Sequence, residues 1–121
     1  MAEKFEDLEV WKRSARLSAE LYKCFSGCKD FGFRDQITRS SLSIPSNIAE
    51  GYERLSIKEC IQFLGYAKGS CGELRTQIFI GIDIGYIDKV IGKQWVQETQ
   101  ELSVMLLALI KARRRFNSPS V

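Results

Sequence analysis

The sequence contains no histidine, only two prolines and no long uncharged apolar run. Without histidine, the commonest general base is missing, as are the Ser-His and Cys-His nucleophile pairs and the Glu-x-x-His metal motif of helical bundles. Without an apolar stretch of about 18 residues, a transmembrane helix is excluded. Catalysis by carboxylates or lysines is still possible, but no sequence pattern indicates it. We therefore expect that the protein is not an enzyme.

The N-terminal segment, MAEKFEDLEVWKR, is charged from its start and lacks the apolar stretch of a secretory signal peptide. We therefore expect a cytoplasmic protein. A chain of 121 residues is long enough for one domain with one hydrophobic core.

Four cysteines, Cys24, Cys28, Cys60 and Cys71, raise the alternatives of disulfides, metal binding and free thiols. Cys24 and Cys28 are one helical turn apart, which differs from the C-x-x-C spacing of a zinc knuckle. Disulfides are rare in cytoplasmic proteins. We therefore expect reduced thiols buried in the core, with no metal and no other cofactor.

The formal charge of +3 is unevenly distributed. Residues 1–60 carry ten basic and ten acidic side chains, whereas residues 61–121 carry eight and five. The run KARRR, at 111–115, contributes four positive charges to the second half. The basicity of this chain is therefore a property of its C-terminal segment.

Apolar residues recur every three or four positions through most of the chain, which predicts amphipathic helices. The predicted helices cover roughly 7–27, 33–53, 57–84 and 88–116. Their lengths and short connections predict an all-α, up-down-up-down four-helix bundle in a single domain, 1–121. The expected core residues of the first helix are Trp11, Leu17, Leu21, Tyr22 and Phe25.

The third helix has clear end signals. Ser56 and Glu59 form a capping box at its start, Gly85 ends it, and Asp88 can cap the fourth helix. The isoleucines at 78–84 also alternate at period two, as in a strand. Because a lone strand would have no pairing partner, a helix is the preferred interpretation.

Three glycines, Gly65, Gly69 and Gly72, lie near one side of this helix. Each costs roughly 1 kcal/mol relative to alanine in a helix interior. We interpret them as a site where a neighbouring helix approaches closely.

The second helix contains the stretch SIPSNIAEG, from Ser43 to Gly51, with Pro45 inside it. Apolar and small residues keep a helical register on both sides of this proline: Phe33, Ile37, Ser41, Ile44, Ile48 and Tyr52. A loop would not preserve that register, so we expect the helix to continue and to bend at Pro45.

Three segments carry a family resemblance: FEDLEVWKRS, FRDQITRSSLSIPSNIAEGYER and KECIQFLGYAKGSCGELRTQI. With the C-terminal LSVMLLALIKARR, they resemble the four-helix-bundle proteins of the 23S ribosomal RNA intervening-sequence family. The resemblance implies a ring-like homopentamer. A similar fold occurs in the accessory variability determinant of diversity-generating retroelements, which binds nucleic acid and a reverse transcriptase through basic surfaces. The chain departs from the family at Arg75, where ELETQ is more usual than ELRTQ.

Two groups of basic residues are candidates for contacts with RNA or DNA. The first comprises Arg34, Arg39, Arg54 and Arg75, since the planar guanidinium matches a phosphate with two hydrogen bonds. The alternative is that Arg34 and Arg39 pair with nearby carboxylates such as Asp35 and merely solvate a helix face.

The second group is the basic run itself: Lys111, Arg113, Arg114 and Arg115. Such a cluster is typical of a nucleic-acid surface. It is equally typical of a helix C-terminus, where cations interact favourably with the helix dipole. The sequence leaves both interpretations open.

Residues of the SIPSNIAEG stretch, together with polar residues embedded among core positions, form a third group with a structural or interface role. Its members are Gln36, Ser43, Pro45, Asn47, Glu50, Gly51, Glu73 and Gln77. A catalytic carboxylate pair could be drawn from such residues, but no spacing demands it. Hydrogen bonds between helices or subunits are the favoured interpretation.

These observations support two hypotheses. The first is a non-enzymatic homo-oligomer, a homopentamer, whose basic surface binds RNA or DNA. The alternative is an assembly module whose partner is another protein and whose charge is incidental. No membrane partner is expected, because the apolar side of the last helix is needed for the core.

Overall fold

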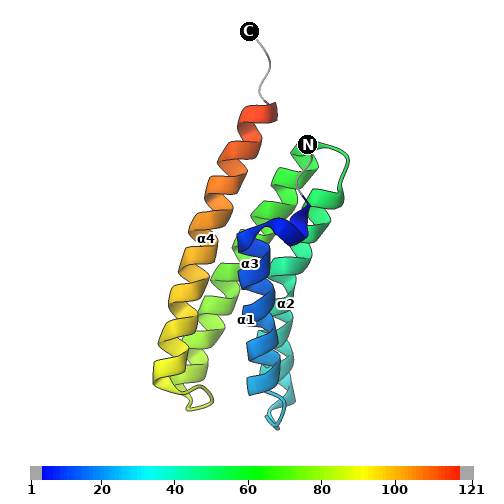
Figure 1. Cartoon of the computed structure of the whole chain (residues 1–121). Helices are drawn as coiled ribbons and strands as arrows, with labels where there is room; N and C mark the ends of the chain where they lie inside the picture. Colours follow the sequence, from blue (N-terminus) through cyan, green and yellow to red (C-terminus); the bar gives the residue numbers. More distant parts are fainter. Residues whose placement is uncertain (1–3, 118–121) are drawn as a thin grey trace.

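The computed structural model describes residues 4–117. A short helical turn, η1 (Phe5–Asp7), precedes the four helices α1 (Glu9–Cys24), α2 (Phe31–Glu53), α3 (Ile57–Asp83) and α4 (Lys89–Asn117). Figure 1 shows consecutive helices running in opposite directions. No strand occurs in the described part of the chain, and the prediction of an all-α fold with four helices is confirmed.

The first helix is shorter than the predicted range 7–27. Leu8 has an extended backbone, with φ −72° and ψ 130°, and separates η1 from α1. At the other end Phe25 leaves the helical conformation, with φ −95° and ψ 6°. The other three helices agree with their predicted ranges to within two residues.

The second helix runs through Pro45 without interruption. Ile37, Ile44 and Ile48 are fully buried, so the core-facing register is the same before and after the proline. Burial of these side chains stabilises a helix that proline by itself would disfavour. The continuous helix is confirmed, whereas a bend at Pro45 stays a prediction.

The ends of α3 are fixed by the residues that the sequence indicated. The Ser56 hydroxyl accepts a hydrogen bond from the Glu59 amide at 3.1 Å and donates one to the Glu59 carboxylate at 3.2 Å. Gly85 has a φ of +82°, a left-handed conformation that glycine adopts without strain. Asp88 then caps α4 by accepting from the amides of Val90 and Ile91 at 3.1 Å.

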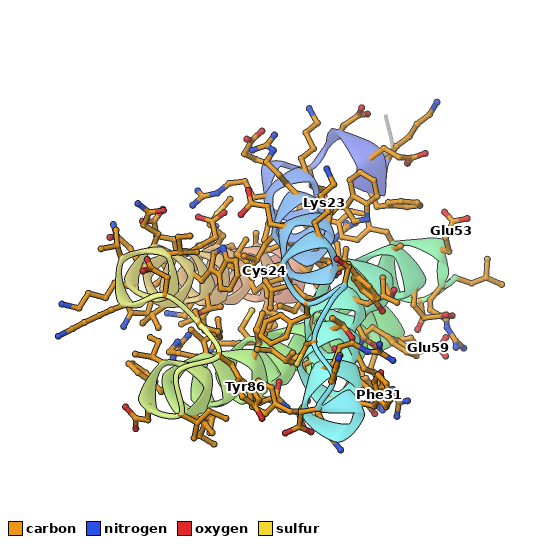
Figure 2. All side chains as sticks on the ribbon, turned by 90° about the horizontal axis from the view of Figure 1, so that it is seen from below. Lys23, Cys24, Phe31, Glu53, Glu59 and Tyr86 are labelled. Carbon is orange, nitrogen blue, oxygen red and sulfur yellow. The ribbon has the colours of Figure 1, made fainter. Side chains whose placement is uncertain are left out.

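Helix α3 packs extensively against both α2 and α4. Helix α1 packs on α2 and makes fewer contacts with α4, an arrangement visible end-on in Figure 2. The fully buried apolar side chains come from all four helices: Leu21, Ile37, Ile44, Ile48, Leu64, Leu74, Ile78, Leu102 and Leu106.

Three sequence-based expectations about packing are wrong. Cys24 and Tyr22 are exposed rather than buried: Cys24 lies in the last turn of α1 at the end of the bundle seen in Figure 2. Tyr22 lines an open groove between α1 and α2. Of the other thiols, Cys60 and Cys71 are buried and Cys28 is half-buried, and all four are free.

The third expectation, a close helix approach at the glycines of α3, is wrong within a single copy of the chain. A Cβ placed on Gly65, Gly69 or Gly72 would meet no atom within 4 Å, so no helix of this chain approaches them closely. The close contact is instead at Gly51 of α2. A Cβ there would lie 3.0 Å from the Cys60 carbonyl oxygen and 3.1 Å from Phe63 Cβ.

Within residues 4–117, no helix combines the length and apolarity that crossing a membrane requires. The same residues contain no cluster of three or more side chains arranged to hold a metal ion.

The contact at Gly51 predicts a stability difference between two glycines. We expect Gly51→Ala to lower the free energy of unfolding by up to about 2 kcal/mol, because overpacking costs roughly 1–3 kcal/mol and helix propensity returns at most about 1 kcal/mol. Gly32→Ala, in the same helix, is the matched control and should leave stability unchanged or raise it, since its Cβ would make only an ordinary contact, 3.8 Å from Asp30 Oδ1. Urea denaturation measures both, and equal responses would contradict this packing.

Candidate nucleic-acid interface

The two candidate arginines of the first half of α2 differ in their surroundings. The Arg34 Nε donates to Asp35 Oδ1 at 3.2 Å, and its guanidinium lies 4.7 Å from the centroid of the Phe31 ring. Arg34 therefore forms the ion pair with Asp35 that the alternative interpretation expected. Arg39 is exposed, and its guanidinium has no hydrogen bond or salt bridge within residues 4–117.

Arg54, just after α2, is held by several contacts. It forms salt bridges with Glu50 at 3.0 Å and Glu59 at 3.5 Å, and it stacks on the Phe63 ring at 4.7 Å. These contacts join the end of α2 to the start of α3. With two carboxylates nearby, the positive charge of Arg54 is largely balanced locally.

Arg75 points from α3 toward α4. Its Nε donates to the Thr99 hydroxyl at 2.9 Å, and its Nη2 donates to the Thr99 carbonyl at 3.1 Å. Thr99 is fully buried. The structure therefore gives Arg75 a bridging role between two helices, which the sequence did not indicate.

The basic run occupies the last turns of α4, which extend past the start of α1 in Figure 1. Arg113 is half-buried and stacks on the Tyr52 ring at 4.6 Å. It also lies against Cys60, whose thiol pKa is raised by burial and partly lowered again by the charge and hydrogen bonding of Arg113. Lys111, Arg114 and Arg115 are exposed.

The eight basic candidates do not form one surface. Arg34 lies at the start of α2, at one end of the bundle, while Arg54 and the basic run lie at the other end. Arg54 stacks on Phe63 of α3, whereas Arg113 stacks on Tyr52 of α2 and lies against Cys60 of α3. Of the eight candidates, three exposed cations, Lys111, Arg114 and Arg115, lie together at the end of α4.

Two serines of α2, Ser40 and Ser43, link this helix to α3. The Ser43 hydroxyl hydrogen-bonds with the Ser70 hydroxyl at 2.7 Å, and the Ser40 hydroxyl donates to Glu73 at 2.8 Å. These are hydrogen bonds between helices of the kind that the sequence favoured. Pro45 is buried, and it borders the groove between α1 and α2.

Other members of the third group bond within or next to their own helix, or have no hydrogen-bond partner for a side-chain atom. The Asn47 side chain donates to the Ser43 carbonyl, one turn earlier in the same helix, at 2.8 Å. Glu50 pairs with Arg54, as described above. Gln36 is exposed, and the buried Gln77 Oε1 has no hydrogen-bond partner within the described residues.

An ion-pair cluster between α1 and α4 was missed by the sequence analysis. Arg13 donates from Nε to Glu98 at 3.0 Å and from Nη2 to Glu101 at 2.6 Å. Its hydrogen bonds hold the pKa of Glu101 below its usual value, with a further contribution from Gln97. The spacing of Glu98 and Glu101 places both on one helix face, but only the tertiary fold shows that Arg13 lies opposite.

Nothing in these clusters indicates a catalytic group. Burial raises the pKa of the Cys71 thiol to about 11, so the thiolate that would act as a nucleophile is scarce at neutral pH. The Arg13 cluster has the geometry of a structural salt bridge.

The arrangement of four helices around the SIPSNIAEG stretch can now be compared with known proteins. The family model described as 23S rRNA-intervening sequence protein matches residues 6–108. The chain belongs to this family. No curated protein sequence matches it.

A solved structure supports the assignment to the intervening-sequence family. It is a protein of unknown function from the S23 ribosomal protein family of Bacteroides thetaiotaomicron. It superimposes with a TM-score of 0.78 at 25% sequence identity, covering 84% of this chain and 98% of the other. This relative has the same fold and adds no activity, since its own function is unknown.

The role of Arg75 can be tested by stability. We expect Arg75→Gln to lower the free energy of unfolding by about 1–3 kcal/mol, because hydrogen bonds from charged groups contribute about that much and the buried Thr99 oxygens lose the guanidinium donor. The exposed Arg39→Gln is the matched control and should change stability by less than about 0.5 kcal/mol. If Arg75→Gln retained full stability in urea denaturation, the bridging role would be incorrect.

Proposed function

We propose that this protein is a non-enzymatic homo-oligomer, a homopentamer, that binds RNA or DNA through the basic end of α4. The observation that carries the nucleic-acid part is the exposure of Lys111, Arg114 and Arg115 on helical turns that extend past α1. Nucleic acids are bound chiefly through such cations, which release the counterions of the phosphate backbone.

Helix capping alone would not require this many cations. Favourable interaction with the helix dipole is limited to the last turn. Lys111 lies one turn before Arg115 and points to the same side of α4, which extends the positive surface along the helix. In a closed ring the surface would be repeated in every copy, and the summed potential would attract an anionic polymer.

The open face of α3 supports the oligomer. Gly65, Gly69 and Gly72 are exposed, and a Cβ at any of them would meet open space. Glycines at these helix-interior positions reduce the stability of the isolated chain, a cost that the close approach of a helix from a second copy would offset. A ring further requires two different surfaces on each copy, one for each neighbour.

A specific observation favours the alternative, an assembly module with a protein partner. A groove of about 620 Å³ lies between α1 and α2 and is lined mostly by apolar and aromatic side chains, among them Phe5, Trp11, Tyr22 and Leu42. Exposed apolar patches of this kind often mark protein interfaces. The groove could serve the ring contact or another protein.

Salt dependence tests nucleic-acid binding. We expect affinity for a short oligonucleotide to fall with salt, with a log–log slope of about −0.7 to −0.9 for each phosphate neutralised. The double variant Lys111→Gln/Arg115→Gln should weaken binding and make the slope shallower by about that amount per charge. Fluorescence anisotropy across a salt series measures both effects.

The matched control removes the same charge at the opposite end of the bundle, as Lys29→Gln/Lys89→Gln, where both lysines are exposed. It should bind as the unmodified protein does. An intact oligomer that binds no oligonucleotide even at low salt would contradict the nucleic-acid function and leave the protein-partner alternative.

Assembly has its own test. We expect light scattering at micromolar concentration to give five times the chain mass of 13.8 kDa. Gly69→Leu should reduce this mass, because its side chain would occupy the space proposed for the neighbouring helix. A monomeric mass for the unmodified protein would refute the ring.

A further inference from the structure

The end of α4 carries an exposed aromatic ring beside its cations. Building on the proposed nucleic-acid function, we propose that this end of the helix selects single-stranded nucleic acid. In this proposal Phe116 is a stacking surface for an unpaired base, and the neighbouring apolar groove holds the adjoining nucleotides. Lys111 and Arg115 contact the phosphates. The ligand class is thus a single strand of RNA or DNA rather than a duplex.

The groove lies between the start of α1 and the second half of α4. It has a volume of about 380 Å³ and is lined mainly by six apolar side chains: Leu8, Val10, Met105, Ala108, Leu109 and Ala112. It exists because α1 begins only at Glu9, so the last turns of α4 are not covered by a first-helix partner. Alanines on α4 leave room for a flat group to lie against the helix.

Phe116 is 74% exposed and follows Ala112 by four residues, so it continues the groove-lining side of α4 by one turn. Two other aromatic rings at this end of the bundle are already covered by cations. Arg113 lies over Tyr52, and Arg54 lies over Phe63. Phe116 has neither a cation nor another ring against it within the described residues, so its faces are accessible to a base.

The charges are placed to guide a backbone along α4. Ala108, Lys111, Ala112 and Arg115 follow the spacing of one helix face, so both cations lie beside the apolar lining. On the α1 side, the groove is bordered by Glu9, whose carboxylate repels phosphate. The nucleic-acid backbone would therefore follow the α4 side of the groove, with the bases directed into the groove.

This combination distinguishes a single strand from a duplex. In a duplex the faces of the bases are stacked on one another, and they cannot reach a ring on the protein surface. In a single strand each base can stack on an aromatic side chain while the phosphates follow nearby cations. Cations alone would bind the more densely charged duplex at least as well.

Three variants at Phe116 separate stacking from bulk: Phe116→Ala removes the ring, Phe116→Leu keeps an apolar side chain, and Phe116→Trp keeps an aromatic face. The probes are an oligothymidylate and an oligouridylate of about ten nucleotides, and a duplex of the same length. We expect the alanine and leucine variants to lose roughly tenfold in affinity for both single strands, and the tryptophan variant to retain it. Duplex binding should be weaker and insensitive to Phe116.

Charge variants distinguish failure of this proposal from failure of the proposed function. If Lys111→Gln/Arg115→Gln weakens binding but all three Phe116 variants bind like the unmodified protein, the nucleic-acid function stands and the stacking proposal is overturned. Equal or tighter binding of the duplex overturns it as well. If the unmodified protein binds no probe at low salt, both proposals fail.

An acidic polypeptide is the remaining occupant to test. Poly-glutamate should compete weakly with the oligothymidylate, since it offers charge without planar rings. Competition as strong as that of unlabelled oligothymidylate would show a general acidic-polymer site and would overturn the proposal. Glu9→Gln should strengthen single-strand binding, because it removes the negative charge bordering the groove.

Discussion

The close packing of α2 against α3 is the contact on which the other helices depend. Gly51 brings the α2 backbone against the Cys60 carbonyl, and Ser43 and Ser70 hydrogen-bond a few turns away. This contact leaves α4 to pack on the other side of α3 and α1 to pack on α2. Within the SIPSNIAEG stretch, Ser43 and Gly51 make this contact, and Ile44 and Ile48 are fully buried.

The same packing uses much of the positive charge that the sequence seemed to offer to a ligand. Arg54 and Arg75 connect pairs of secondary-structure elements, and Arg113 stacks on Tyr52. Because guanidinium groups bound to carboxylates, hydroxyls or aromatic faces contribute little net attraction for phosphate, composition overstates the basic surface. Among the candidate residues, the exposed cations that lie together are Lys111, Arg114 and Arg115 at the end of α4.

Similarity to the Bacteroides protein shows how tolerant this architecture is. At 25% identity the two chains retain the same fold, because helical periodicity and core volume can be met by many sequences. Fold similarity by itself assigns no activity. The surfaces of this chain that internal packing does not constrain are the glycine face of α3, the groove between α1 and α2, and the end of α4.

The sequence by itself determined the helices, their caps and much of the core, because these depend on local periodicity and on side chains within a few residues. Ser56, Gly85 and Asp88 act where their chemistry predicts, and Ile44 and Ile48 keep their register across Pro45. Only the tertiary structure decided which glycine is crowded, which arginines are occupied and where Arg13 finds Glu98. Those outcomes depend on which residues far apart in the chain become neighbours, and helical spacing carries no information about that.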